Sequence, residues 1–141
     1  MNLPNEIFVD TSFFIALLNS KDEHHQKALA LQKQLSANNI RKVTSEYILL
    51  ELGDGLSNLR FRHLAVQVLD LIYQDNSFDI IPTSSEIFTK ALKLFKKRPD
   101  KAWGMTDCTS FIILWDLMLD TVLTADHHFQ QAGFRALLLE P

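Results

Sequence analysis

Short strand-like segments alternate with longer segments of helical periodicity along the whole chain. Residues 7–9 form an uninterrupted apolar run, which is typical of a strand buried on both faces of a parallel sheet. Four later segments are bounded by turn residues and have a similar length. We therefore predict strands at residues 7–9, 41–45, 78–81, 121–124 and 135–139.

The segments between these strands carry apolar residues at helical spacing. Ala28, Leu31 and Leu35 lie at i, i+3 and i+7 and share one face. Apolar residues occupy most of the circumference of segment 107–119, which predicts the most buried helix. Thr106 is the expected N-cap of that helix. The predicted helices cover residues 13–19, 22–37, 46–56, 59–74, 85–97, 107–119 and 126–131.

Strands that alternate with helices predict a parallel sheet with right-handed crossovers and helices on both faces. The chain has 141 residues, which suits one domain with a single core. We therefore expect one α/β domain over residues 1–141, built as a three-layer α/β/α sandwich around a parallel sheet.

Composition indicates a soluble globular protein, with 47% hydrophobic and 22% charged residues. No apolar run approaches the roughly 18 residues that span a bilayer. Asn5 and Glu6 stand where a signal peptide would carry basic residues. Cys108 is the single cysteine, which fits a reducing compartment. We expect a cytoplasmic protein without a membrane partner.

The charge and the glycine pattern narrow the possible ligands. A net charge of −3 argues against nucleic-acid binding through a large basic surface. Bound divalent cations would offset that charge, so a metal-dependent nuclease stays compatible with it. The four glycines form neither of the glycine-rich phosphate-binding motifs.

Four carboxylates stand at comparable junctions of the predicted elements. Asp10 follows the first strand, Glu51 lies about one and a half turns into the helix after the second strand, Asp107 begins the buried helix, and Asp126 follows the fourth strand. The carboxyl edge of a parallel sheet opens into the ligand crevice, so these side chains are expected to converge there. Each acid also has a simpler interpretation: Asp10 and Asp126 as N-caps, Asp107 as a first-turn acid, and Glu51 as a solvated charge.

Converging carboxylates repel one another unless cations neutralise them, and such oxygen ligands favour Mg²⁺ or Mn²⁺. Metal ions at such a site orient and deprotonate water and stabilise a leaving oxygen. The acids therefore predict metal-assisted phosphodiester hydrolysis. A metal-free binding module on the same fold is the alternative. A phosphatase of the haloacid-dehalogenase type is less favoured, because Ser12 stands where that chemistry uses a second Asp.

Four blocks of the sequence resemble the PIN-domain family, in particular its VapC-like toxin ribonucleases. They are VDTS at 9–12, TSEYILLE at 44–51, MTDCTSF at 105–111 and LTADHHFQQAGF at 123–134. The resemblance implies an α/β/α sandwich, Mg²⁺ or Mn²⁺ as cofactor, and endonucleolytic cleavage of RNA. It also implies a small antitoxin partner, and more weakly a homodimer.

Carried over by position, the resemblance assigns a role to seven residues. Asp10, Glu51, Asp107 and Asp126 match the catalytic acids, and the three aspartates among them match metal ligands. Thr11, Ser12 and Thr124 match hydroxyl positions that orient these carboxylates. One departure is Asp54-Gly55, where relatives more often carry Asn-Ala.

Two further groups of residues are considered for the site. His127 and His128 are left out, because neighbouring residues do not share a helix face and capping or surface roles suffice. The basic residues on which RNA affinity could depend are Arg60, Arg62, Lys96, Lys97, Arg98 and Lys101, although a solvated face is the favoured interpretation for most of them.

Overall fold

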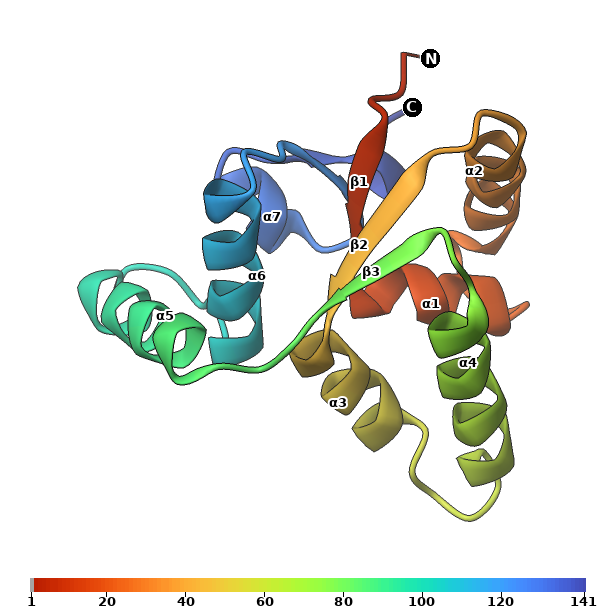
Figure 1. Cartoon of the computed structure of the whole chain (residues 1–141), viewed down its shortest axis with the longest axis horizontal. Helices are drawn as coiled ribbons and strands as arrows, with labels where there is room; N and C mark the ends of the chain where they lie inside the picture. The colour runs from red at the N-terminus through yellow and green to blue at the C-terminus, as the bar shows by residue number, and fades with distance from the viewer. Residues whose placement is uncertain (1) are drawn as a thin grey trace.

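The computed structural model describes residues 2–141 and contains a five-stranded parallel sheet with helices on both faces (Figure 1). The strand order is β3-β2-β1-β4-β5, so the first strand of the chain lies in the middle. This confirms the predicted α/β class. The strands are β1 (Glu6–Val9), β2 (Arg41–Ser45), β3 (Phe78–Ile81), β4 (Thr121–Leu123) and β5 (Arg135–Ala136).

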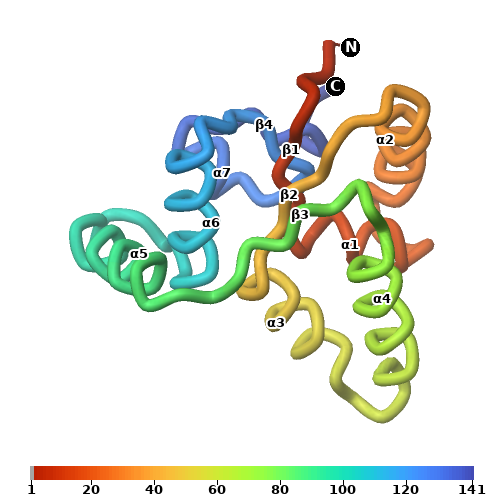
Figure 2. Tube along the Cα trace, in the orientation of Figure 1, coloured from red at the N-terminus to blue at the C-terminus, as the bar shows by residue number. Residues whose placement is uncertain are grey.

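The helices form the two outer layers of the sandwich. In the Cα trace, α1, α2 and α4 lie on one side of the sheet and α6 and α7 on the other (Figure 2). Helix α5 packs on the outside of α6, and α3 lies at the carboxyl end of β2. The helices are α1 (Thr11–Leu18), α2 (His25–Ala37), α3 (Glu46–Gly55), α4 (Arg62–Gln74), α5 (Ser85–Lys97), α6 (Met105–Asp116), α7 (His127–Gln131) and the 3₁₀ helix η1 (Leu137–Leu139).

Aromatic side chains pack in both helical layers. On one face, Phe14 of α1 stacks on Phe78 of β3 with ring centroids 6.0 Å apart. On the other face, Phe111 of α6 contacts Trp103 at 5.0 Å and Phe129 of α7 at 5.1 Å. Burial of such a side chain contributes about 1.5–3 kcal/mol. Both layers thereby fix the elements that begin at the carboxyl edge of the sheet.

Two helices begin three residues later than predicted, and the same cause applies to both. The Asp22 side chain accepts from the backbone N–H of His24 at 2.8 Å, and the Asn58 side chain accepts from that of Phe61 at 2.9 Å. Such side-chain bonds stabilise a turn in place of the first helical turn. Helices α2 and α4 therefore start at His25 and Arg62, not at residues 22 and 59.

Helix α6 differs from its prediction at both ends. Its N-cap is Gly104, not Thr106, because the Asp107 carboxylate accepts from the Gly104 backbone N–H at 3.1 Å and closes the first turn. The helix ends at Asp116, and Met118 follows with a positive φ of 55°. Six of its twelve residues are buried, a larger share than in any other α-helix of the described range, which confirms that interpretation.

The last predicted strand is shorter than expected. Strand β5 covers only Arg135–Ala136, and Leu137–Leu139 form a 3₁₀ helix in place of residues 137–139 of the predicted strand. The backbone N–H of Leu138 donates to the Thr124 carbonyl at 3.2 Å, which turns the chain away from the sheet edge.

The two ends of the described chain meet away from the carboxyl edge. The Arg135 guanidinium donates to the Asn2 carbonyl at 2.9 Å and pairs with Glu140. Strands β1, β2 and β4 end at the opposite edge, which carries the site described below (Figure 1). None of the helices in residues 2–141 has the length and apolar character that crossing a membrane requires.

Candidate active site

A cavity of about 510 Å³ opens where β1 and β4 end. It brings together all four acids that the sequence singled out, together with Asp22. No Lys or Arg is among the described residues that line it. The lining consists of Asp10, Thr11, Ser12, Ile15, Asp22, Glu51, Ala102, Gly104, Asp107, Ala125, Asp126 and His128.

Asp10 lies at the centre of this arrangement and is only 5% exposed. Its Oδ2 accepts from the Ser12 hydroxyl at 2.9 Å and from the Thr124 hydroxyl at 2.8 Å. The same carboxylate accepts from the Ser12 backbone N–H at 3.5 Å and caps α1. The capping role and the place in the cavity therefore coexist in one side chain.

The electrostatics of Asp10 reflect this burial. Loss of solvation raises the pKa of its carboxyl to about 6, against the two hydroxyl bonds that lower it. The negative charges of Glu51 and Asp107 raise this pKa further. A cation in the cavity would lower this pKa again, because an opposite charge nearby stabilises the carboxylate.

The three predicted hydroxyl residues tie the acid-bearing segments together. Ser12 and Thr124 lie 3.1 Å apart through their hydroxyl oxygens, and the Ser12 hydroxyl accepts from the Ala125 backbone N–H at 2.9 Å. The Thr11 hydroxyl donates to Glu51 at 2.5 Å and links α1 to α3. These bonds connect the turn after β1 both to the turn after β4 and to α3.

Asp107 and Asp126 approach the cavity from the starts of α6 and α7. Burial and the Asp126 charge raise the pKa of the Asp107 carboxyl, whereas the Gly104 backbone bond and neighbouring His128 oppose that shift. Asp126 caps α7 by accepting from the His128 backbone N–H at 2.9 Å. Glu51 is the most solvent-accessible of the four, yet its side chain still lines the cavity.

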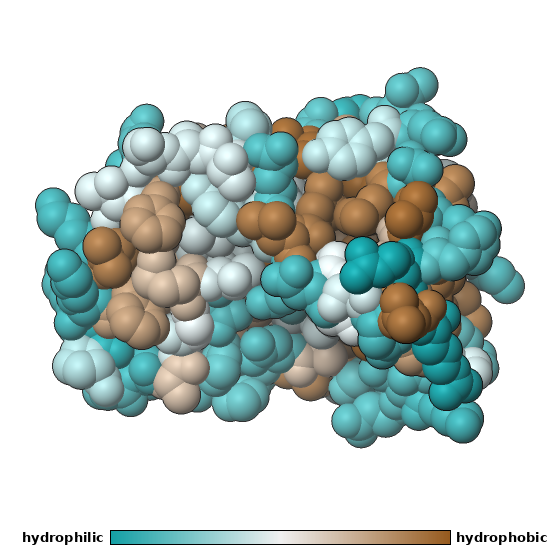
Figure 3. All heavy atoms as spheres, turned by 90° about the horizontal axis from the view of Figure 1, so that it is seen from below, coloured by the Kyte–Doolittle hydropathy of each residue, from teal (hydrophilic) through white to brown (hydrophobic). Residues whose placement is uncertain are grey.

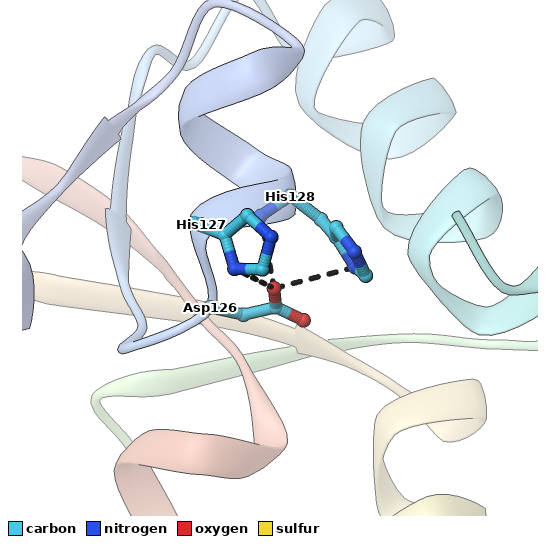
Figure 4. A group of neighbouring side chains, drawn as sticks. All are labelled: Asp126, His127 and His128. Carbon is cyan, nitrogen blue, oxygen red and sulfur yellow. Dashed lines mark hydrogen bonds and ion pairs between the residues drawn. The ribbon is translucent and has the colours of Figure 1, made fainter. Parts of the chain in front are cut away.

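The sequence prediction that both histidines lie outside the site is wrong for His128. Its Nδ1 lies 3.2 Å from Asp107 Oδ2 and 3.3 Å from Asp126 Oδ1. His127 Nδ1 lies 3.9 Å from the same Asp126 oxygen, and its side chain is 68% exposed (Figure 4). The two rings indeed do not share a helix face, because only His128 lines the cavity, but this argument does not exclude His128 alone. Asp126 is the N-cap and precedes the helix. A cap residue can meet the side chains of the first turn.

Asp22 is a second lining residue that the sequence analysis did not identify. It was assigned to the start of a helix, whereas it lies in the turn between α1 and α2 and faces the cavity. A turn-forming Asp before a predicted helix carries no separate signal in one sequence. Its position depends on how α1 packs against the sheet.

The donor set of the cavity suits a divalent cation. Asp10, Asp107 and Asp126 present carboxylates from three separate elements, and Glu51 and Asp22 also line the cavity. Oxygen donors of this kind favour Mg²⁺ and Mn²⁺. No Lys or Arg among the described lining residues offsets these negative charges, and Glu51 and Asp107 add to the rise in the Asp10 pKa that burial causes. These residues therefore fit a resident cation.

Fold and site together define an α/β protein with an acidic cavity at the carboxyl edge of a parallel sheet. The family model of the PIN domain matches residues 7–135, a range that contains all four predicted acids. The chain belongs to the PIN-domain family.

Several relatives are similar over most of this chain. The 23S rRNA-specific endonuclease VapC20 of Mycobacterium tuberculosis is 29% identical over 129 residues, which cover 91% of this chain and 95% of the relative. A VapC ribonuclease of Archaeoglobus fulgidus is 28% identical over 117 residues, covering 81% and 73% of the two chains. These relatives carry endonuclease or ribonuclease names, and this chain is VapC-like.

Solved structures agree with the fold. The crystal structure of Mycobacterium tuberculosis VapC20, described as a Sarcin-Ricin loop cleaving toxin, matches with a TM-score of 0.77 and 27% identity, over 91% of this chain and 95% of that one. VapBC2 of Rickettsia felis, bound to a DNA fragment from its promoter, matches with a TM-score of 0.66 over 93% and 96% of the chains. At 18% identity, the second match supports the fold alone.

Proposed function

We propose that this protein is a Mg²⁺- or Mn²⁺-dependent endoribonuclease and acts as the toxin of a type II toxin–antitoxin pair. The observation that carries the proposal is the convergence of Asp10, Glu51, Asp107 and Asp126 on one cavity without a Lys or Arg among its described lining residues. The similarity to VapC20, named as a 23S rRNA endonuclease, supports RNA as the substrate class.

In this proposal Asp10, Asp107 and Asp126 hold the cation, and Glu51 completes the acidic wall. A bound Mg²⁺ or Mn²⁺ supplies a Lewis acid that activates water and stabilises the leaving oxygen of a phosphodiester. Ser12 and Thr124 fix the orientation of Asp10, because both hydroxyls donate to the same carboxylate oxygen. Thr11 holds Glu51 toward the cavity.

No side chain is needed as the nucleophile. Cys108 is an unsuitable one, since burial raises the pKa of its thiol to about 11.

Removal of divalent cations tests this function. Purified protein with Mn²⁺ is expected to cleave single-stranded or structured RNA, and excess chelator is expected to stop cleavage because the acids then lack their neutralising ion. Gel electrophoresis of end-labelled RNA measures the effect. Restored cleavage on readdition of Mn²⁺ is the control, and cleavage that persists in chelator contradicts the proposal.

Basic residues on α5 and in the loop that leads from it to the cavity support contact with RNA. Six of the fourteen Lys and Arg residues fall within residues 90–101, from the middle of α5 into the loop that follows. Lys93, Lys96 and Lys97 are exposed and form no ion pair with any residue in the range 2–141. The loop continues directly into Ala102 and Gly104 of the cavity wall. The carboxyl end of α5 lies on the side of α6 away from the sheet, and the loop returns from there to the cavity (Figure 1). An RNA strand that follows this basic segment and the loop would therefore lead to the acids.

Charge reversal on α5 is expected to weaken RNA binding. The double substitution Lys96→Glu and Lys97→Glu removes two positive charges from the proposed path, so the slope of log affinity against log salt should fall by about one or more. Fluorescence anisotropy with a labelled RNA over a salt series measures it. The matched control is Lys27→Glu with Lys33→Glu, two lysines of α2 outside this segment and outside the cavity lining. Equal losses of RNA affinity in both double variants would contradict the proposal that RNA follows α5.

An antitoxin partner is part of the proposal, and exposed apolar side chains support it. Leu50, Leu59, Val66, Leu71 and Tyr73 are all exposed on α3, on α4 or between them. Brown side chains gather over this region in Figure 3, seen from the carboxyl-edge side. Apolar patches of this kind mark sites of protein contact. A partner segment could cover them and place a basic residue in the acidic cavity, and a homodimer would use similar surfaces.

The second candidate function is a metal-free PIN-fold module that binds RNA or protein. The cavity disfavours it, because five carboxylates line one pocket and the Asp10 carboxyl has a raised pKa. Calorimetric titration with Mn²⁺ separates the two functions. The module predicts no heat of binding, whereas the ribonuclease predicts a saturable isotherm.

A further inference from the structure

The imidazole of His128 faces two of the carboxylates that are proposed to hold the cation. Its Nδ1 is almost equidistant from Asp107 Oδ2 and Asp126 Oδ1, at 3.2 and 3.3 Å. The His128 side chain is 21% exposed and lines the acidic cavity. One nitrogen atom therefore lies between carboxylates that come from two different helices.

The local structure fixes the position of this ring. The backbone N–H of His128 donates to Asp126, which caps α7, so the two residues are held in one turn. The next residue, Phe129, is fully buried and packs edge-on against Phe111 of α6. The Asp107 carboxylate is itself fixed by the Gly104 backbone. The nitrogen and the two oxygens are thus placed by separate constraints.

The spacing also matches that of donors around one cation. Neighbouring ligands of an octahedral Mg²⁺ or Mn²⁺ ion are about 3 Å apart, since each lies about 2.1 Å from the ion. Ligand atoms of Asp126, His127 and His128 all lie within 4.8 Å of one another. The stick view shows both rings directed toward the Asp126 carboxylate (Figure 4). His127 is the weaker candidate, because its ring is mostly exposed and lies farther away at 3.9 Å.

We propose that His128 Nδ1 is a nitrogen ligand of the cation held by Asp107 and Asp126, and that this nitrogen makes the site prefer Mn²⁺ over Mg²⁺. Imidazole suits first-row transition ions, whereas Mg²⁺ prefers oxygen donors and retains water. The inference rests on the proposed function for the presence of a cation, and it concerns which atoms bind that cation. The competing role for His128 is a hydrogen bond to the carboxylates without contact to the ion.

Pulsed EPR of Mn²⁺ bound to the full chain tests the proposal directly. A coordinated imidazole gives ¹⁴N modulation of the Mn²⁺ echo, and ¹⁵N-histidine labelling of the wild-type chain alters that modulation. We expect the signal in the wild type and in His127→Gln, and its loss in His128→Gln. The labelled wild-type sample provides the readout even where a variant folds poorly, and His127→Gln is the matched control from the adjacent position.

Metal titrations supply the second readout. In calorimetry, His128→Gln is expected to lower Mn²⁺ affinity by at least about tenfold while changing Mg²⁺ affinity much less. Bound Mn²⁺ without nitrogen modulation in the wild type would overturn the ligand assignment and leave the proposed ribonuclease intact. Absence of Mn²⁺ binding by the wild type would overturn both. Equal losses of Mn²⁺ and Mg²⁺ affinity in His128→Gln would overturn the proposal that His128 makes the site prefer Mn²⁺.

Discussion

Replacement of Asp10 or Asp107 by Asn is expected to lower Mn²⁺-dependent RNA cleavage by roughly 10³-fold or more, because metal-ion catalysis supplies several kcal/mol of transition-state stabilisation. Both carboxylates line the cavity, and both are substantially buried. An amide keeps the shape of each side chain and removes the charge that attracts the cation. Cleavage of end-labelled RNA by the purified variants measures the loss.

The matched control for this experiment is Asp70→Asn. Asp70 is an exposed residue of α4 and does not line the cavity, so its substitution should leave the cleavage rate within about twofold. Far-UV circular dichroism of each variant checks that the fold is retained. Wild-type rates in both Asp10→Asn and Asp107→Asn would refute the hydrolytic assignment.

The second large effect concerns the stability of the metal-free protein against pH. The folded pKa of Asp10 is about 6, above its ordinary value of 3.8. Between these values the folded state binds more protons than the unfolded state, so the free energy of unfolding falls as pH rises through this window. Because of Asp10, the free energy of unfolding is lower above about pH 6 than below about pH 4, by about 3 kcal/mol. Asp107 has a shift of the same sign.

Other acids make the free energy of unfolding rise with pH, and their effect must be separated from that of Asp10. The pKa of Asp100 is lowered by its bond to Arg98, and that of Glu140 by its bond to Arg135, so both stabilise the fold more above their unfolded pKa. The comparison of wild type with Asp10→Asn cancels these groups. Urea denaturation in chelator at pH 4, 5, 6 and 7 should show the variant gaining stability relative to the wild type as pH rises. Parallel curves for the two proteins would contradict the buried, destabilising charge.

These two predictions describe one trade-off at the site. The buried Asp10 carboxylate lowers the stability of the metal-free fold, while the same burial increases the attraction of the cavity for a cation. A variant that is more stable and inactive is the expected result for Asp10→Asn. Active sites commonly retain such destabilising charges, because function requires them.

The sequence was sufficient to predict that the four acids meet. Asp10 and Asp126 follow strands, Asp107 begins a helix, and Glu51 lies early in another, so a parallel sheet places all four near the same edge. The strand order β3-β2-β1-β4-β5 does not follow from hydrophobic periodicity. That order decides that the ends of β1 and β4 are neighbours and that Ser12 can reach Thr124.

The features that were missed depend on contacts between distant segments or on local turns. His128 lies in the cavity because α7 packs against α6, and periodicity within α7 carries no information about that packing. Asp22 and Asn58 delay the starts of two helices through side-chain bonds that compete with the helical ones. In a single sequence, an Asp or Asn at such a position is equally consistent with a helix start and with a turn.

Anomalous diffraction from crystals grown with Mn²⁺ tests the central claim most directly, because it locates the cation without reference to activity. The account predicts an anomalous peak within coordination distance of carboxylate oxygens of Asp10, Asp107 and Asp126. A protein that cleaves RNA in Mn²⁺ but shows its manganese peak elsewhere, or none in this cavity, would contradict it.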